Sequence, residues 1–158
     1  MKKVKLFSML MATFIAFENC CAHCFTVRNP DISEVKTIVK KFKGFVSWNK
    51  LTEELVENNI DNTYVAHDDN NNPLAYLRVS LLNSETIHIH DLVTLKEYRG
   101  NRIAEGLLNK IKEDYPDLKI ELTPTKKSIG FYEKMNFKYL EQLNVCIYKS
   151  NQSSGRIL

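Results

Sequence analysis

Cysteine and glycine are scarce in this sequence of 158 residues, which contains four cysteines and five glycines. Cys20, Cys21 and Cys24 lie together near the N-terminus and Cys146 stands alone in an apolar run, a spacing that excludes a disulfide framework. Structural zinc sites usually take two separated pairs of ligands, and the cluster around His23 has no second pair. We therefore predict no metal site, and Cys146 as a small buried core residue.

A strong excess of one charge is also lacking. The net charge is +3, from 22 Lys and Arg against 19 Asp and Glu, and carboxylates are interleaved with lysines along the chain. This balance argues against a dedicated nucleic-acid-binding protein, although a local basic loop can still hold a phosphorylated ligand. The length and the 44% hydrophobic content are those of one domain with its own core.

Long hydrophobic runs are lacking except at the N-terminus. Three lysines within the first five residues precede an apolar run over residues 6–17, and Ala22 is a tolerable cleavage position, which gives the segment the form of a secretory signal peptide. The run is shorter than the ~20 residues of a spanning helix. The alternatives are an apolar helix packed in front of the domain, or a later start at Met9 or Met11.

These patterns divide the chain into three parts. We predict a signal-like or anchor-like extension over residues 1–24, a folded domain over residues 25–150 and a polar tail over residues 151–158. If the extension works as a signal, the domain is exported or membrane-associated, with membrane contact only through the extension. If it does not, the protein is cytoplasmic.

Apolar periodicity predicts the element order β, α, α, β, β, β, α, β, α, β, β. Pro30 prevents an earlier start of the first helix, and Ser33 is its predicted N-cap. Residues 68–73 form the predicted tip of a hairpin. The predicted strands cover residues 25–28, 64–67, 74–79, 86–94, 118–122, 137–140 and 145–148, and the predicted helices cover residues 33–42, 49–58, 103–114 and 126–135.

The stretch from Ile87 to Leu108 runs from a strand through a basic loop into a helix. The loop places Gly100 and two arginines just before the helix. A helix N-terminus offers unpaired N–H groups and a partial positive charge, so a phosphate group fits there. An ordinary strand-to-helix turn has the same local pattern. In the strand, the alternation predicts two sides, with Ile87, Ile89 and Asp91 on one and His88, His90 and Leu92 on the other.

Two separated motifs, together with the element order, point to a known family. The motifs are Leu92-Val93-Thr94 with Tyr98-Arg99-Gly100-Asn101-Arg102-Ile103-Ala104, and Phe131-Tyr132-Glu133-Lys134-Met135-Asn136-Phe137. They resemble the GCN5-related N-acetyltransferase (GNAT) superfamily, over residues 25–149. The resemblance implies an α/β (α+β) fold with a mixed, mostly antiparallel central sheet that is flanked by helices and splayed at its central strands.

The resemblance also implies an acetyl-CoA site. Backbone amides of the loop hold the pyrophosphate in this family, and a splayed strand pairs with the pantetheine arm and leaves an amide for the thioester oxygen. Arg102 stands where the family has glycine, and a side chain there can crowd the ligand, so we expect altered rather than abolished binding. The cofactor-binding residues implied are Leu92, Val93, Thr94, Arg99, Gly100, Asn101, Arg102, Ile103, Ala104 and Thr125.

Tyr132 falls where the family's tyrosine donates a proton to the departing thiolate. Without the resemblance, the sequence pattern predicts that Tyr132 is a core aromatic residue of an amphipathic helix. Thr125 occupies a position where the family often has asparagine, and Asn136 replaces a glycine in a left-handed position that asparagine tolerates.

His88 resembles in position the catalytic glutamate of histone-type members, six residues before Thr94, and an imidazole titrates near neutral pH. We therefore predict His88 as the group that deprotonates the amine. The alternatives are that His88 and His90 are merely satisfied polar side chains on a half-buried strand, or that a water chain removes the proton.

The resemblance implies an acetyl-CoA-dependent N-acetyltransferase in which a primary amine attacks the thioester directly. The alternative is a non-catalytic CoA-binding or interaction module of the same fold. Acetyl-CoA is expected as co-substrate, with no metal and no nucleic-acid partner. The class of amine is open, and so is the choice between a monomer and a homodimer.

Overall fold

The computed structural model describes residues 24–45 and 51–150. The signal-like segment, the cluster of Cys20, Cys21 and His23, and the polar tail therefore lie outside the described residues, apart from Cys24, which is exposed. Within the described part of the chain, no helix has the length and apolar character needed to cross a membrane. The same part contains no group of three or more His, Cys, Asp and Glu side chains arranged for a metal ion.

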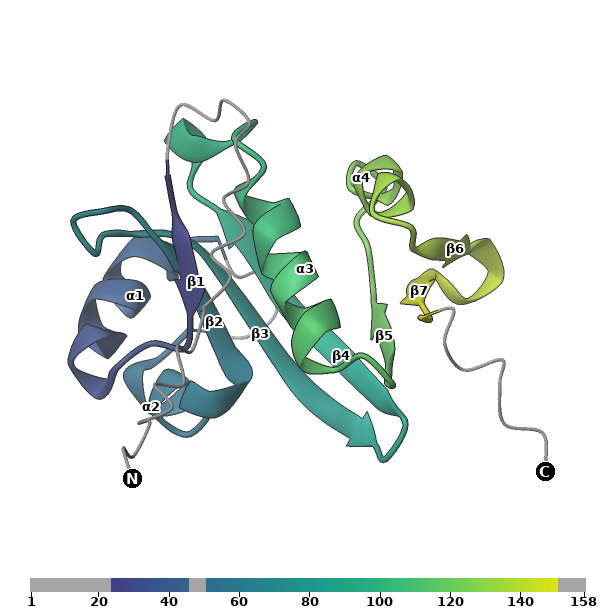
Figure 1. Ribbon diagram of the computed structural model, residues 1–158, viewed down its shortest axis with the longest axis horizontal. Coiled ribbons are helices and arrows are strands. Elements are labelled where there is room, and N and C mark those ends of the chain that lie inside the picture. The colour runs from purple at the N-terminus through teal and green to yellow at the C-terminus, as the bar shows by residue number, and fades with distance from the viewer. Residues whose placement is uncertain (1–23, 46–50, 151–158) are drawn as a thin grey trace, which may run out of the picture.

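Seven strands form one mixed sheet in the order β1-β2-β3-β4-β5-β7-β6 (Figure 1). All neighbouring strands are antiparallel except β4 and β5, which are parallel. This mostly antiparallel sheet confirms the predicted fold class. The strands are β1 (Thr26–Arg28), β2 (Thr63–His67), β3 (Pro73–Asn83), β4 (Thr86–Thr94), β5 (Lys119–Leu122), β6 (Lys138–Leu140) and β7 (Val145–Tyr148).

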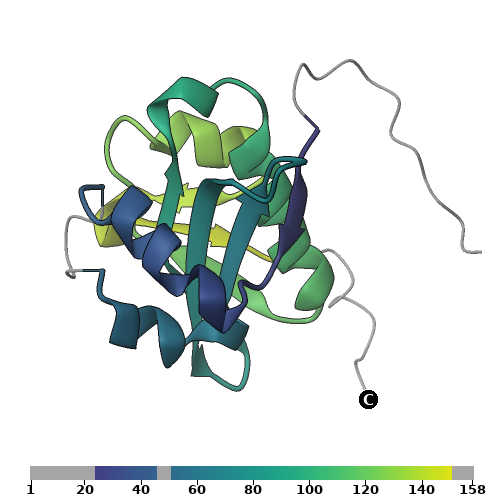
Figure 2. The ribbon, with the colours of Figure 1, turned by 90° about the vertical axis from the view of Figure 1, so that its left-hand side faces the viewer.

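The helices cover both faces of this sheet (Figures 1 and 2). Side chains of α1 pack with Val65 and Tyr76 on one face, whereas side chains of α3 pack with Leu77 and Ile87 on the other. The element order agrees with the prediction. The helices are α1 (Val35–Phe42), α2 (Glu53–Glu57), α3 (Ile103–Asp114) and α4 (Ile129–Lys134), with 3-10 turns η1 (Ile32–Glu34), η2 (Ile60–Asn62), η3 (Lys96–Tyr98) and η4 (Glu141–Leu143).

Two helices are shorter than predicted. α2 begins after Thr52, whose hydroxyl oxygen accepts a hydrogen bond from the Leu55 N–H at 3.1 Å, and residues 49 and 50 of the predicted helix lie outside the described residues. α4 begins only at Ile129, because the preceding residues form a turn that Ser128 closes onto Thr125. Periodicity alone extended that helix back to residue 126.

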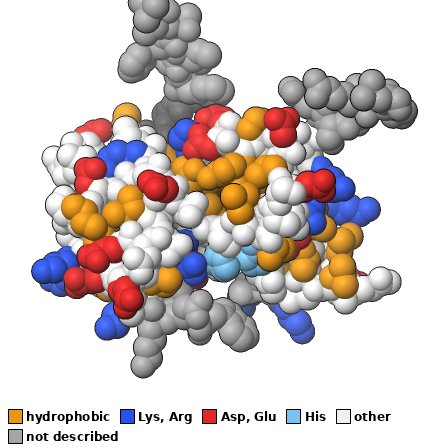
Figure 3. Space-filling view, turned by 90° about the horizontal axis from the view of Figure 1, so that it is seen from below, with side chains coloured by type: hydrophobic (Ala, Val, Ile, Leu, Met, Phe, Trp, Pro, Cys, Tyr) orange, Lys and Arg blue, Asp and Glu red, His pale blue; other side chains and the backbone are white. Residues whose placement is uncertain are grey.

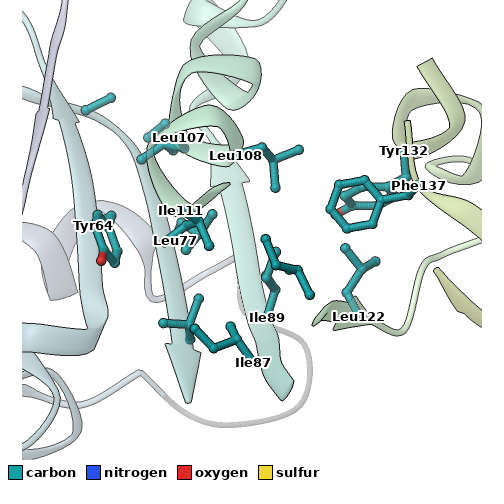
Figure 4. Close-up of a cluster of buried hydrophobic side chains, with 14 of the residues drawn as sticks. Tyr64, Leu77, Ile87, Ile89, Leu107, Leu108, Ile111, Leu122, Tyr132 and Phe137 are labelled. Atoms are coloured by element: carbon teal, nitrogen blue, oxygen red, sulfur yellow. The ribbon is translucent and has the colours of Figure 1, made fainter. Parts of the chain in front are cut away.

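The larger core lies between α3 and the sheet (Figure 4). Tyr132 and Phe137 face Ile89 and Leu108 across the middle of this cluster. Cys146 is 0% exposed, as predicted. This core joins the C-terminal strands and α4 to the central strands, and so fixes where α4 stands relative to β4.

The first helical turn is capped by a cluster that the sequence prediction placed differently. Asp31, not Ser33, is the N-cap residue, and its N–H donates to the Glu34 carboxylate at 2.8 Å. Arg28 binds both oxygens of the same carboxylate at 2.7 Å, and Nε2 of the fully buried His67 lies 3.2 Å from it. Glu34 therefore links β1, β2 and the first helix.

Acidification should weaken the fold through Glu34. The Arg28 hydrogen bonds lower the pKa of Glu34 from 4.5 to about 2, so the unfolded chain takes up the proton first. The stability that Glu34 contributes is complete above pH 4.5 and is lost as the pH falls toward 2, by about 1 kcal/mol after allowance for solvent screening. Urea unfolding at pH 7 and pH 3 should show this loss in the wild type and a smaller one in Glu34→Gln. Equal losses would contradict it.

A β-bulge divides β4 into two parts. Val79 pairs with Ile89, but Arg78 pairs with Asp91, so His90 is the extra residue. The bulge reverses the alternation beyond it: Leu92 packs with the α3 core, whereas Asp91 pairs with Arg78. The predicted alternation is therefore wrong from this point, because a bulge turns every later side chain to the other face.

β4 also separates from β5 at this bulge. The parallel ladder runs from Thr86 with Lys119 to Ile89 with Leu122, while β4 itself continues to Thr94. The last residues of β4 therefore pair with β3, and their other edge borders the space between β4 and α4. This divergence is the predicted splaying of the central strands.

Candidate active site

A cleft of about 710 Å³ lies where β4 and β5 diverge. One side is the end of β4, one end is the start of α3, and the opposite wall comes from the turn before α4 and from α4 itself. The predicted site residues that line it are Leu92, Val93, Thr94, Arg99, Gly100, Arg102, Ile103, Ala104, Thr125 and Tyr132. The structure thus brings together two motifs that are far apart in the sequence.

The start of α3 has the geometry of an anion site. Gly100 has φ +84° and Arg102 has φ +59°, and together these left-handed residues turn the chain so that α3 begins at Ile103 inside the cleft. The first intrahelical bond runs from the Gly106 N–H to the Arg102 carbonyl. The amides of Ile103, Ala104 and Glu105 precede this bond, and such amides bind anions.

Arg102 occupies a left-handed backbone conformation that suits glycine, the residue that the sequence resemblance implies at this position. Its side chain is 65% exposed and points along the helix to Glu105, with Nε 2.8 Å from Oε2. This hydrogen bond lowers the pKa of Glu105. The guanidinium is thus directed to the first turn of α3, where a phosphate group would have to compete with Glu105 for it.

The left-handed position predicts a difference between two truncations of Arg102. Arg102→Gly and Arg102→Ala both remove the guanidinium and its pair with Glu105, but only alanine keeps the steric penalty at φ +59°. Arg102→Gly should therefore be more stable than Arg102→Ala by about 1 kcal/mol. Chemical denaturation of both variants measures the difference, and a more stable alanine variant would contradict it.

Arg99 and Asn101 support the loop from within. Arg99 Nε donates to the Thr94 carbonyl at 3.2 Å, which ties the loop to the end of β4. Asn101 Nδ2 donates to the Tyr98 carbonyl at 3.2 Å. Asn101 was predicted to bind the cofactor, but it is not among the residues that line the cleft. Through this hydrogen bond the amide side chain of Asn101 shapes the loop.

Tyr132 lies at the other end of the cleft, on α4. Its side chain is 8% exposed and packs edge-on against Phe131 and Phe137. Burial, with a smaller effect of Cys146, raises the pKa of Tyr132 to about 12. The phenol is therefore protonated at neutral pH, as a proton donor must be.

The turn before α4 forms the wall that faces the loop. Thr125 is held there by Ser128, whose hydroxyl oxygen accepts from the Thr125 N–H at 2.9 Å and whose hydroxyl donates to the Thr125 carbonyl at 3.0 Å. Lys127, in the same turn, also lines the cleft. The turn thus brings a further cation to the side opposite Arg99 and Arg102.

His88 lies outside this cleft. It points to the sheet face opposite α3, next to His90, and Nε2 of His90 lies 2.7 Å from the Ser80 hydroxyl. Histidine side chains reach the surface in the middle of Figure 3. His88 is therefore on the same strand as the cleft but reaches the opposite face.

Several residues of the cleft were missed by the sequence prediction: Phe45, Tyr98, Glu105, Lys127, Ser128 and Phe131. Tyr98 and Phe131 belong to the two motifs given in the sequence analysis, so their places next to predicted site residues could have indicated that they line the cleft. Phe45 and Lys127 give no local signal, because only the tertiary fold brings them to the cleft.

The cleft thus joins a helix N-terminus suited to a phosphate group with a buried phenol at its far end, an arrangement expected of a transferase that uses a phosphorylated donor. The chain matches the model of the acetyltransferase (GNAT) family over residues 32–137. It belongs to this family, as the sequence motifs indicated. A comparison with curated proteins gives no match.

Solved structures of the same fold include three at low sequence identity. N-acetylglutamate synthase from Neisseria gonorrhoeae, complexed with coenzyme A and L-arginine, is 12% identical with a TM-score of 0.67, and the match covers 80% of this chain and 33% of that chain. The PaiA N-acetyltransferase from Thermoplasma acidophilum, in complex with coenzyme A, is 17% identical with a TM-score of 0.63, and the match covers 80% of this chain and 99% of that chain. A GNAT family acetyltransferase from Brucella melitensis, in complex with acetyl-CoA, is 14% identical with a TM-score of 0.63, and the match covers 86% of this chain and 92% of that chain. The chain thus spans a third of the synthase but nearly all of the PaiA enzyme.

Proposed function

We propose that the protein transfers an acetyl group from acetyl-CoA to a primary amine by direct attack of the amine on the thioester. The observation that carries this proposal is the cleft, which joins an anion-binding helix N-terminus to a buried phenol along the unpaired edge of β4. Structural relatives with coenzyme A or acetyl-CoA bound support it.

The residues present fit a donor of this kind. The amides at the start of α3 suit a pyrophosphate, and Arg99, Arg102 and Lys127 line the same cleft. The edge of β4 from Leu92 to Thr94 suits an extended amide-containing arm, because an exposed strand edge offers backbone donors and acceptors. Leu92, Val93 and Phe131 give this part of the cleft apolar walls.

The reaction then needs one group that accepts a proton and one that donates it. Because His88 lies on the sheet face opposite α3, the acceptor approaches the thioester from that face in this scheme. His88 takes a proton from its ammonium group, which frees the nitrogen lone pair to form the C–N bond. As the C–S bond breaks, Tyr132 gives its proton to the thiolate. The second proton of the nitrogen restores the Tyr132 phenol, and His88 releases its proton to solvent. A backbone amide of β4 stabilises the negative oxygen formed between these steps.

The cysteines of the described residues favour direct attack over an acyl-enzyme. Cys146 is buried, and burial raises the pKa of its thiol, which keeps it in the poorly nucleophilic thiol form. Cys24 lies just before β1 and does not line the cleft. Neither thiol is placed to accept the acetyl group.

Isothermal titration of the full chain with acetyl-CoA tests donor binding, and release of free CoA in the presence of a panel of amines tests transfer. We expect micromolar binding and amine-dependent release. No binding would overturn the proposal. Binding without release for any amine would favour a non-catalytic CoA-binding module of the same fold.

A further inference from the structure

Polar side chains form a row across β3, β4 and β5 on the sheet face opposite α3. The row contains Ser80 on β3, His90 and His88 on β4, and Glu121 on β5. Ser80 Oγ lies 2.7 Å from His90 Nε2, the two imidazole rings meet edge-on at 5.0 Å, and His88 Nδ1 lies 3.6 Å from Glu121 Oε1.

The fold places His88 and Glu121 together. They are register partners on the parallel strands β4 and β5, so both side chains leave the sheet on the same face. Their side chains are 25% and 18% exposed, which weakens solvent screening relative to a surface pair. Lys119 Nζ lies 3.2 Å from the other oxygen of Glu121, and this contact fixes the orientation of the carboxylate.

The surroundings of His90 are different. Arg78 is close to it, and burial together with Arg78 and His88 lowers the pKa of His90. The charge of Arg78 is itself balanced by Asp91, whose Oδ2 lies 2.8 Å from the guanidinium. Of the two imidazoles, His88 has a carboxylate at ion-pair distance, Glu121 Oε1 at 3.6 Å, whereas the Asp91 carboxylate near His90 is itself bound to Arg78.

From this geometry we infer that Glu121 is the positioning residue of His88 in the transfer reaction. A carboxylate beside Nδ1 favours the tautomer with the proton on Nδ1, which leaves the Nε2 lone pair for the ammonium proton. The distance of 3.6 Å is an ion-pair distance, and contacts of this kind tighten when the substrate complex forms. The inference rests on the proposed acetyl transfer.

Glu121→Gln tests this role, because it keeps the shape of the side chain and removes its charge. With a primary amine acceptor at pH 7, kcat should fall about tenfold, while the Kd for acetyl-CoA stays within twofold. The loss should shrink as the pH approaches the pKa of the free amine, because the amine then needs no base. Glu113→Gln, an equal charge change on the exposed side of α3, is the control and should leave kcat unchanged.

A double-variant cycle separates positioning from a general effect on the fold. In a His88→Ala background, Glu121→Gln should cause no further loss, because it acts through the missing ring. His90→Ala should cost less than His88→Ala. Additive losses, a pH-independent loss, or a larger effect at His90 would overturn the inference while leaving acetyl transfer by the wild type intact. A wild type without transfer activity would overturn the proposed function itself.

Discussion

Replacing Tyr132 by phenylalanine should lower kcat for acetyl transfer by about 100-fold, while the Kd for acetyl-CoA changes by less than twofold. In the proposed reaction the phenol is the acid that protonates the leaving thiolate, and loss of a general acid typically costs 10²- to 10⁴-fold, about 100-fold at the lower end. The ring itself packs against Phe131 and Phe137, and phenylalanine preserves that packing. Steady-state kinetics and titration calorimetry measure the two quantities separately.

Tyr139→Phe is the matched control for this experiment. It removes a hydroxyl that binds the side chain of Asn144 on the surface, away from the residues that line the cleft, and should leave kcat unchanged. Equal turnover in Tyr132→Phe and the wild type would remove Tyr132 from the mechanism. A parallel loss of donor affinity would instead assign the hydroxyl to binding.

Asp91→Asn should destabilise the fold by about 3 kcal/mol, since it leaves a buried guanidinium without its counter-charge. Arg78 and Asp91 are joined by two contacts, from Nε at 3.0 Å and from the terminal nitrogen at 2.8 Å, and their side chains are 7% and 11% exposed. The bulge at His90 brings the two residues opposite each other. Urea denaturation at pH 7 measures the change.

Two further variants show whether the lost charge pairing is the cause. Lys110→Gln breaks an exposed pair with Asp114 within one helix and should cost about 0.5 kcal/mol or less. Arg78→Met combined with Asp91→Leu removes both charges and should be more stable than Asp91→Asn alone. A double variant that is as unstable as the single one would refute the assignment to an orphaned charge.

Much of this fold could be predicted from the sequence, because its signals are local. The apolar runs of β2 and β3, the alternation in the first part of β4, the helical spacing of Ile103, Leu107 and Ile111, and Pro116 after α3 each follow from the chain itself. Asn136 adopts φ +65°, as its position before Phe137 indicated. The anion site was visible for the same reason.

The remainder depends on partners that are distant in the sequence. The bulge at His90 arises from the register between β3 and β4, and no residue type between Ile87 and Thr94 indicates a bulge there. The left-handed backbone of Arg102 and its pair with Glu105, which direct the side chain along α3, could not be read from the sequence, which indicated only that a side chain there can crowd the ligand. His88 and Glu121 lie side by side because β4 and β5 pair in parallel, and the order of elements in the sequence alone does not reveal this pairing.

The ladder between β4 and β5, which runs from Thr86 with Lys119 to Ile89 with Leu122, forms a seam between the two parts of the sheet. Strand pairing there ends at Ile89 and Leu122 although β4 continues to Thr94, and a ladder that stops before the end of its strand frays more easily than one that continues. A donor that spans the cleft from the edge of β4 to Tyr132 on α4 closes this seam from outside. Amide hydrogen exchange in β5 and β7 should therefore slow when acetyl-CoA binds. Exchange rates in these two strands would then measure donor binding, although neither strand is predicted to contact the donor.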